Sequence, residues 1–266
     1  MGTKAVILCG GQGTRIREAS ESMPKPMLPI GGKPIVWHIM KMYAAHGITE
    51  FVLCLGYKSW AIKEFFLNYR AMTNDVQLTL GKNHAVEIIG GAPEEEWRIT
   101  LAETGEDTMT GGRVAAVRRY VENDELFCLT YGDGVSDVDI TKLLAFHRAH
   151  GKACTVTAVR PPGRFGEMRL EADAVTEFNE KPQATEGLIN GGFFVCDARR
   201  IWDYLPMQKS LTLEQEPMRQ LADKGELRAF RHAGFWQPMD TLREFNLLNE
   251  LWAKGKAPWK TWKDGP

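Results

Sequence analysis

The sequence lacks any apolar stretch close to the 18 residues that a membrane-spanning helix needs. The apolar run near the N-terminus ends in glycines after five residues, which is too short for a secretory signal peptide. A surplus of charge is also missing: the formal net charge is −1, so no broad basic field attracts nucleic acid or anionic lipid. We therefore expect neither a membrane nor a nucleic acid as partner, and an anionic substrate must be met by local Lys and Arg side chains.

Cysteine is scarce and shows no pairing pattern. The five cysteines are odd in number, form no C-x-x-C pair, and each lies in or beside a strand-like run. This usage is typical of small buried side chains in a reducing cytoplasm, where we expect the protein to act. The sequence suggests no Ser/His/Asp set or Cys/His pair, so its chemistry requires no covalent enzyme intermediate.

What the sequence does contain is a glycine-rich loop after a strand. Ala5–Cys9 is an apolar run typical of a buried strand, and Gly10-Gly11-Gln12-Gly13-Thr14-Arg15 follows it. Glycines there allow a ligand to approach the backbone N–H groups closely. Lys25 lies ten residues beyond Arg15, next to prolines. Bare amides with a guanidinium and an ammonium group indicate a polyanion-binding loop, most simply for a nucleoside triphosphate.

Two other phosphate-binding loops fit less well. A dinucleotide fingerprint that starts at Gly11 needs a third glycine where Ile16 stands, which disfavours a dehydrogenase. A P-loop needs Ser or Thr after Gly-Lys, whereas the Gly-Lys pairs here precede Pro, Asn or Ala. An ordinary strand-to-helix turn stays open for the glycines alone, but Arg15 and Lys25 make it less favoured.

Alternating strand and helix patterns predict the fold class. The segments 34–47 and 57–67 have helical spacing, whereas 51–55 and 126–131 are short buried strands. We expect an α/β fold: a Rossmann-like mixed, mostly parallel sheet flanked by helices, forming a single domain over 1–266. Residues 74–104 predict a small antiparallel β excursion with strands at 76–80, 85–89 and 97–101. Residues 242–266 predict a C-terminal helix and a tail containing two tryptophans.

Two aspartates are candidate metal ligands. Asp133 lies between two glycines directly after the strand 126–131, and Asp240 precedes the final helix. Taken alone, the first is typical of an Asp-Gly turn and the second of a helix cap. Together with the glycine loop, they suit Mg²⁺, which prefers carboxylate and phosphate oxygens. Transfer between phosphates needs mainly positioning and charge neutralisation, which these residues supply.

At this point the sequence resembles a family, the sugar-phosphate nucleotidylyltransferases. The resemblance rests on LCGGQGTR (8–15) with Lys25-Pro26, YGDG (131–134) and EKP (180–182). Narrower phrases are similar to the glucose-1-phosphate cytidylyltransferase family; these are MTGGR (109–113), INGGFFV (189–195), EQEP (214–217), GFWQPMDTLR (234–243) and KGKAPWKTW (254–262). The resemblance implies transfer of a cytidylyl group from CTP to α-D-glucose 1-phosphate with Mg²⁺. It also implies a homo-oligomer that feeds CDP-dideoxysugar and O-antigen (lipopolysaccharide) biosynthesis.

The same resemblance assigns site residues. The nucleotide side comprises Leu8, Cys9, Gly10, Gly11, Gln12, Gly13, Thr14, Arg15, Lys25, Thr108, Arg113 and Gly132. The sugar-phosphate side comprises Glu180, Lys181 and Asn190, and the metal ligands are Asp133 and Asp240. Arg15, Lys25 and Lys181 are the expected catalytic cations.

Arg113 carries a hypothesis about the base. Relatives that use UTP or dTTP have a different phrase where this chain has Gly111-Gly112-Arg113. Cytosine offers acceptors at O2 and N3, and an arginine that donates to both would favour it by roughly 1–3 kcal/mol, as in comparable base readout. Two alternatives remain: a uridylyl- or thymidylyltransferase, and a nucleotide-sugar sensor without catalysis.

Overall fold

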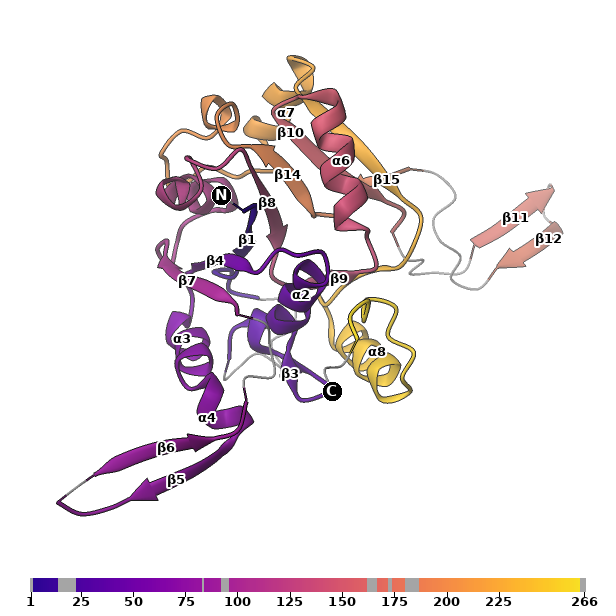
Figure 1. Cartoon of the computed structure of the whole chain (residues 1–266). Coiled ribbons are helices and arrows are strands. Elements are labelled where there is room, and N and C mark those ends of the chain that lie inside the picture. Colours follow the sequence, from indigo (N-terminus) through magenta and orange to yellow (C-terminus); the bar gives the residue numbers. More distant parts are fainter. Residues whose placement is uncertain are drawn as a thin grey trace.

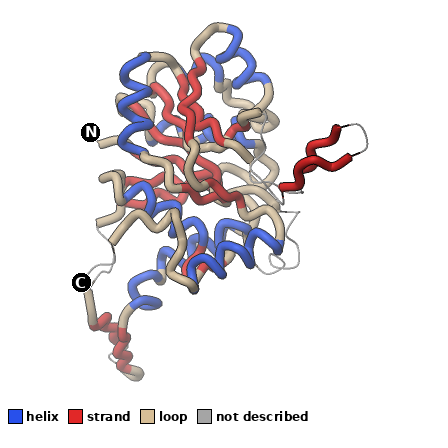
Figure 2. Tube along the Cα trace, turned by 90° about the vertical axis from the view of Figure 1, so that its right-hand side faces the viewer, coloured by secondary structure: helices blue, strands red, loops and turns tan. Residues whose placement is uncertain are grey.

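The computed structural model has a central mixed β-sheet with helices on both faces (Figures 1 and 2). The structure describes residues 2–13, 23–82, 84–91, 96–161, 167–171, 174–179 and 187–263, with the backbone alone for 167–171 and 174–179. No helix within these ranges is long and apolar enough to cross a lipid bilayer. The expected fold class is confirmed.

The N-terminal half of the sheet is parallel. Its strands are β1 (Lys4–Leu8), β4 (Glu50–Leu55), β7 (Arg98–Glu103) and β8 (Leu126–Tyr131). β1 lies between β4 and β8, and β4 also pairs with β7, all in parallel register. Because these strands run the same way, the loops after their carboxyl ends meet at one edge of the sheet, where α/β proteins bind ligands.

The C-terminal half makes the sheet mixed. Its strands are β10 (Cys154–Val159), β13 (Ile189–Asn190), β14 (Phe194–Asp197) and β15 (Leu227–His232). β14 joins this half to β8 in antiparallel register, and β10 pairs with β14 and β13 on one side and with β15 on the other. Gly192 and Phe193 have positive φ angles between β13 and β14, which breaks the register at that point.

The sheet is apolar on both faces because helices cover each of them. Ala5 and Ile7 of β1 pack into one core cluster, while Val6 and Leu8 pack into the other. The first face is covered by α2 (Ile35–Ala44), α6 (Ile140–His150) and α8 (Leu242–Ala253). The second face is covered by α5 (Thr110–Ala116), η3 (Arg118–Tyr120), η4 (Ile201–Tyr204) and α7 (Glu216–Asp223). All five cysteines are buried and free, as expected.

Short elements complete the body of the protein. They are η2 (Lys25–Met27), β2 (Pro29–Ile30), β3 (Lys33–Pro34), α3 (Ser59–Leu67), α4 (Tyr69–Thr73), β9 (Gly134–Ser136) and β16 (Trp236–Pro238). β9 pairs with β16 in antiparallel register, although about a hundred residues separate the two strands in the sequence. This short ladder fastens the segment before α8 to the end of β8.

The predicted β excursion is a two-stranded arm. β5 (Asp75–Thr79) and β6 (Ala85–Ile89) pair with each other and project away from the body (Figure 1). The third expected strand, at 97–101, was wrongly assigned to the excursion. It belongs to β7, which completes the parallel edge of the main sheet because Ile99 and Leu101 pack against the core. A second hairpin joins β11 (Glu167–Glu171) to β12 (Ala174–Asn179).

The C-terminal tail docks onto the body through aromatic contacts. Trp259 is fully buried and packs beside Trp252 of α8. Its indole Nε1–H donates to Nδ1 of His38 on α2 over 3.4 Å, and Nε2 of His38 lies 2.8 Å from the carbonyl oxygen of Ile30. A carbonyl oxygen can only accept, so Nε2 carries the proton and Nδ1 is left to accept from Trp259. His38 therefore holds the tail as a neutral imidazole.

Acid is expected to destabilise this contact. Burial lowers the pKa of His38 from 6.5 to about 4. Between these pH values the unfolded chain therefore binds a proton at His38 that the native protein does not bind. Stability should fall as the pH drops from about 6.5 towards 4, with His38 contributing up to about 3 kcal/mol. Urea unfolding gives the free energy of unfolding at each pH. Between pH 6.5 and 4 this free energy should fall less steeply with decreasing pH for His38→Gln than for the wild type. His84→Gln, which removes an exposed histidine, is the control. An equal pH dependence of the free energy of unfolding in the wild type and His38→Gln would contradict this role.

Candidate active site

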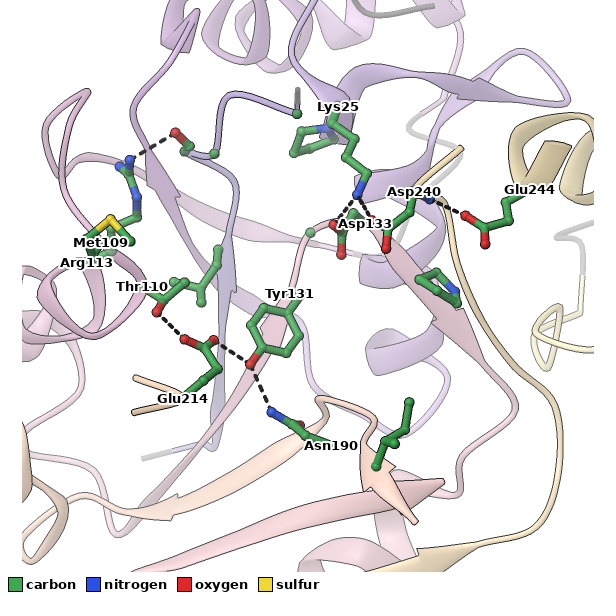
Figure 3. A pocket seen from close by; sticks show the side chains of 18 of the residues that line it. Lys25, Met109, Thr110, Arg113, Tyr131, Asp133, Asn190, Glu214, Asp240 and Glu244 are labelled. Atoms are coloured by element: carbon green, nitrogen blue, oxygen red, sulfur yellow. Dashed lines mark hydrogen bonds and ion pairs between the residues drawn. The ribbon is translucent and has the colours of Figure 1, made fainter. Parts of the chain in front are cut away.

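A cleft of about 780 Å³ opens at the carboxyl ends of the parallel strands (Figure 3). Most of the expected site residues that the structure describes line it: Leu8, Gly10, Gly11, Gly13, Lys25, Thr108, Arg113, Gly132, Asp133, Asn190 and Asp240. Cys9 lies beneath the surface, fully buried, and burial raises the pKa of its thiol well above the ordinary value. Gln12 is described but is not part of the lining. Thr14, Arg15, Glu180 and Lys181 lie outside the described residues.

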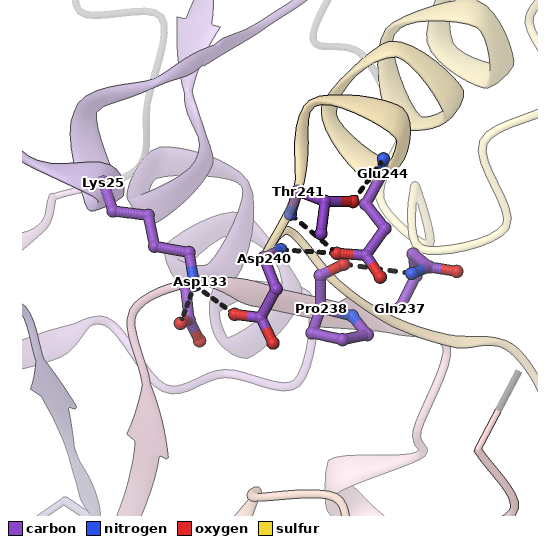
Figure 4. Close-up of polar contacts among 7 residues, drawn as sticks. All are labelled: Lys25, Asp133, Gln237, Pro238, Asp240, Thr241 and Glu244. Atoms are coloured by element: carbon purple, nitrogen blue, oxygen red, sulfur yellow. Dashed lines mark hydrogen bonds and ion pairs between the residues drawn. The ribbon is translucent and has the colours of Figure 1, made fainter. Parts of the chain in front are cut away.

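Lys25 joins the two candidate metal ligands. Its Nζ lies 2.5 Å from Oδ2 of Asp133 and 2.5 Å from Oδ1 of Asp240 (Figure 4). The Lys25 side chain is only 10% exposed. Burial disfavours its ammonium form, but the charges and hydrogen bonds of both aspartates outweigh burial, and the pKa of Lys25 is raised. Lys25 is therefore a permanent cation between two carboxylates.

The β9–β16 ladder explains why these aspartates meet. Asp133 directly precedes β9, and Gly134 pairs with Pro238 of β16. The Met239 N–H then donates to the Asp133 carbonyl oxygen over 2.8 Å. This register brings Asp240 beside Asp133 despite their distance in the sequence.

Asp240 does not cap the final helix. Thr241 is the N-cap of α8 and forms a capping box with Glu244. Oε2 of Glu244 also accepts a hydrogen bond from the backbone N–H of Asp240 over 2.6 Å. The helix start is thus satisfied by its neighbours, which leaves the Asp240 side chain directed at Lys25 (Figure 4). The alternative reading of Asp240 as a cap is wrong.

The two aspartates fit a divalent cation. Both oxygens touch one Nζ atom, so they lie at most twice 2.5 Å apart. Adjacent or opposite oxygens around Mg²⁺ are separated by about 3–4 Å, since each lies about 2.1 Å from the ion. In the described part of the chain, no group of three or more His, Cys, Asp or Glu side chains could hold a metal. Two carboxylates with substrate phosphate and water oxygens are nevertheless the arrangement that Mg²⁺ commonly uses.

Arg113 fastens the loops on the other side of the cleft. It is 4% exposed, and its Nη atoms donate to the carbonyl oxygens of Gly10, Leu55, Gly105 and Glu106 at 2.7–3.0 Å. Nη1 also donates to Oγ1 of Thr104 over 2.8 Å. A Cβ atom at Gly10 would lie 2.1 Å from Nη1 of Arg113, so a larger residue there would push the guanidinium away from its carbonyl partners. The direct cytosine contact stays a prediction, and the geometry gives Arg113 a holding role for the ends of β1, β4 and β7.

Thr108 provides an unused donor at the same side. Its side chain is buried, and its hydroxyl has no hydrogen-bond partner among the residues that the structure describes. A buried hydroxyl without a partner is unfavourable unless a ligand satisfies it. Thr108 lines the cleft, and its assignment to the nucleotide side stays a prediction.

Sequence reasoning missed a hydrogen-bond network that runs from α5 across the cleft to Asn190. The Glu214 carboxylate accepts from the hydroxyls of Thr110 and Tyr131, each over 2.6 Å, and Asn190 Nδ2 donates to Tyr131 Oη over 3.1 Å (Figure 3). This network links α5 to the ends of β8 and β13. The phrase EQEP and the tyrosine before Gly132-Asp133 were visible in the sequence, but nothing there paired them.

Comparisons with known proteins agree with this geometry. The family model described as nucleotidyl transferase matches residues 4–245. The chain belongs to the nucleotidyl transferase family.

More particular relatives carry one name. A Salmonella typhi protein named glucose-1-phosphate cytidylyltransferase is 52% identical over 260 residues, which cover 98% of this chain and all of the relative. A Bacillus subtilis protein named "Probable glucose-1-phosphate cytidylyltransferase" is 44% identical over 97% of this chain and all of its own length. The chain is thus an enzyme of the nucleotidyltransferase type, similar along nearly its whole length to glucose-1-phosphate cytidylyltransferases.

Solved structures show the same fold. A putative glucose-1-phosphate thymidylyltransferase from Bacillus anthracis, in complex with a sucrose, superposes with a TM-score of 0.70 at 16% identity. The match covers 99% of this chain and 98% of that one. At this identity the likeness concerns the fold alone.

Replacing Arg113 should destabilise the loops of the cleft without changing the relative affinities for CTP and UTP. Arg113→Ala removes the hydrogen bonds that tie the ends of β1, β4 and β7 together and takes the guanidinium donor from the Gly105 and Glu106 carbonyl oxygens. We therefore expect the free energy of unfolding to fall by at least about 2 kcal/mol. Affinities for CTP and UTP should fall by similar factors, measured by calorimetry. Arg118→Ala, at an arginine paired with Glu122 on the surface, is the control. A loss confined to CTP would support the base-reading hypothesis and contradict a purely holding role.

Proposed function

We propose that the protein is a glucose-1-phosphate cytidylyltransferase, which converts CTP and α-D-glucose 1-phosphate into CDP-glucose and pyrophosphate. The single observation that carries this proposal is the 52% identity over 98% of the chain to a relative of that name. The cleft supports it, because a glycine loop, a lysine and two carboxylates face one another there.

The proposed reaction is a single in-line displacement. A phosphate oxygen of glucose 1-phosphate attacks the α-phosphorus of CTP, and the bond from that phosphorus to the bridging oxygen breaks, releasing pyrophosphate. The protein must hold two anions that repel each other and neutralise the charge at the attacked phosphorus. Lys25 and the amides of Gly11–Gly13 face the triphosphate in this proposal, with Thr14 and Arg15 as further proposed contacts. The segment from Leu8 to Gln12 borders the nucleoside. Thr108 and Arg113 lie near the base or ribose, with Gly132 behind them.

The carboxylates Asp133 and Asp240 would hold Mg²⁺ here. When bound, such an ion polarises phosphate oxygens and neutralises developing charge. Asn190, with the proposed Glu180 and Lys181, would bind the sugar phosphate. The negative charge of the Glu214 carboxylate disfavours anionic phosphates nearby. The part of the cleft beside Glu214 therefore suits the uncharged hydroxyl groups of a sugar.

The wider setting is also a proposal. The chain forms one nucleotidyltransferase domain over 1–266, works in the cytoplasm and supplies CDP-dideoxysugars for O-antigen synthesis. A homo-oligomer is supported by the β5–β6 arm, where the apolar side chains of Val76, Leu78, Val86 and Ile89 are exposed. Large apolar groups gathered on a protruding arm are typical of a contact surface.

A nucleotide panel tests the activity. Pyrophosphate release should be fastest with CTP among CTP, UTP, dTTP, ATP and GTP, each supplied with glucose 1-phosphate and Mg²⁺. Asp133→Ala should lower kcat by at least about a hundredfold, since it removes a ligand of the cation that would neutralise charge at the reacting phosphates. Asp223→Ala, at the exposed end of α7, is the matched control and should keep full activity.

Other outcomes of this panel separate the alternatives. Faster turnover with UTP or dTTP would keep the chemistry but contradict the cytidylyl assignment. Tight CTP binding without turnover of any nucleotide would indicate a nucleotide-sugar sensor.

A further inference from the structure

The ammonium of Lys25 and a divalent cation compete for one position. Nζ of Lys25 bridges Asp133 Oδ2 and Asp240 Oδ1 at 2.5 Å each. An ion bound by the same two oxygens would lie about 2.1 Å from each of them. Both cations would then share the same two oxygens at close range, where two positive charges repel strongly in a partly buried site. The two occupants therefore exclude each other.

The charge at the site also depends on the lysine. Two carboxylates with Lys25 between them present one net negative charge, whereas the carboxylates alone present two. Their side chains are 33% and 21% exposed for Asp133 and Asp240, so solvent screens this difference only in part. A divalent cation is thus attracted far more weakly while Lys25 remains in place.

Lys25 has one evident alternative partner. Its backbone lies in the short η2 helix between Pro24 and Pro26, which holds its Cα in place. Its unbranched side chain can still change rotamer, and its compact ammonium binds phosphate as a point charge. Lys25 lines the same cleft as Gly11 and Gly13, which belong to the loop that the proposed function assigns to the triphosphate. A bound triphosphate offers the ammonium oxygens of equal or greater charge.

We propose that Lys25 is the exchangeable counter-ion of the metal site: it holds Asp133 and Asp240 together in the free protein and leaves when a nucleotide triphosphate binds. This inference rests on the proposed function and adds an order in which the nucleotide and the divalent cation bind. The divalent cation binds well only after the nucleotide has withdrawn Lys25. By linkage, metal and nucleotide then raise each other's affinity by the same factor.

Binding of Mn²⁺ to the nucleotide-free protein tests the proposal without any turnover. Electron paramagnetic resonance of unbound Mn²⁺ should show weak binding by the wild type. Lys25→Met, which keeps the apolar stem but removes the charge, should bind Mn²⁺ at least about tenfold more tightly, within the roughly 5–150-fold range of typical site coupling. Lys33→Met removes an equal charge on β3 away from the carboxylates and should match the wild type.

A double variant locates the effect. Lys25→Met combined with Asp240→Asn should lose the gain in Mn²⁺ affinity, because one of the two carboxylates is gone. Thermal unfolding gives a second readout: Lys25→Met should melt below the wild type without metal, since its carboxylates repel, and Mn²⁺ should raise its Tm more than that of the wild type. Equal Mn²⁺ affinity in wild type and Lys25→Met would overturn the exchange.

Failure of the exchange is distinguishable from failure of the proposed function. With CTP present, Mn²⁺ binding by the wild type should depend on Asp240. If Asp240→Asn leaves that binding unchanged, the metal site of the proposed function is wrong and the exchange falls with it. If binding depends on Asp240 but Lys25→Met shows no gain, the metal site stands and only the exchange is overturned.

Discussion

The placement of one ammonium group between two carboxylates is the constraint on which the cleft depends. Lys25, Asp133 and Asp240 come from three distant parts of the chain, and each reaches the site through a different element. Two carboxylates this close repel unless a cation separates them. The contact therefore needs the parallel sheet, the β9–β16 ladder and the η2 turn to form together. The same contact places the ammonium group of Lys25 in the cleft, where a bound phosphate would need a positive charge.

Arg113 has a corresponding role on the opposite side of the cleft. It ties the carboxyl ends of β1, β4 and β7 together by donating to carbonyl oxygens at the end of each strand. A long cation with several donors suits this task, because the loops there have turned away from the sheet. The two cations differ in whether they can contact a ligand. Lys25 can change partner when a charged ligand arrives, whereas Arg113 is held by protein oxygens.

Much of the fold was predictable because its signals are local. The alternation of apolar strands with helical spacing predicted β1, α2, β4 and β8, and the glycine loop predicted the edge where ligands bind. The strand at 97–101 was assigned to the wrong sheet, because a short apolar run does not reveal its pairing partner. β7 pairs with β4 across some forty residues, and only the packing of the whole core selects that partner.

The candidate site was predictable in composition but not in geometry. Asp133 and Asp240 were proposed as ligands, and yet Asp240 alone was typical of a helix cap; the neighbouring Thr241 takes that role. The network of Glu214, Thr110 and Tyr131 was out of reach, because its members belong to segments that meet only when the sheet is complete. The role of Arg113 differed for the same reason: its carbonyl partners lie at the ends of three separate strands.

A crystal structure with Mn²⁺ and a non-hydrolysable CTP analogue tests the central claim most directly. Anomalous scattering locates the ion without ambiguity. The account predicts Mn²⁺ between Asp133 and Asp240, bound also by phosphate oxygen, with Lys25 Nζ moved onto the triphosphate. Mn²⁺ held away from these aspartates, or Lys25 still bridging them beside the bound nucleotide, would contradict it.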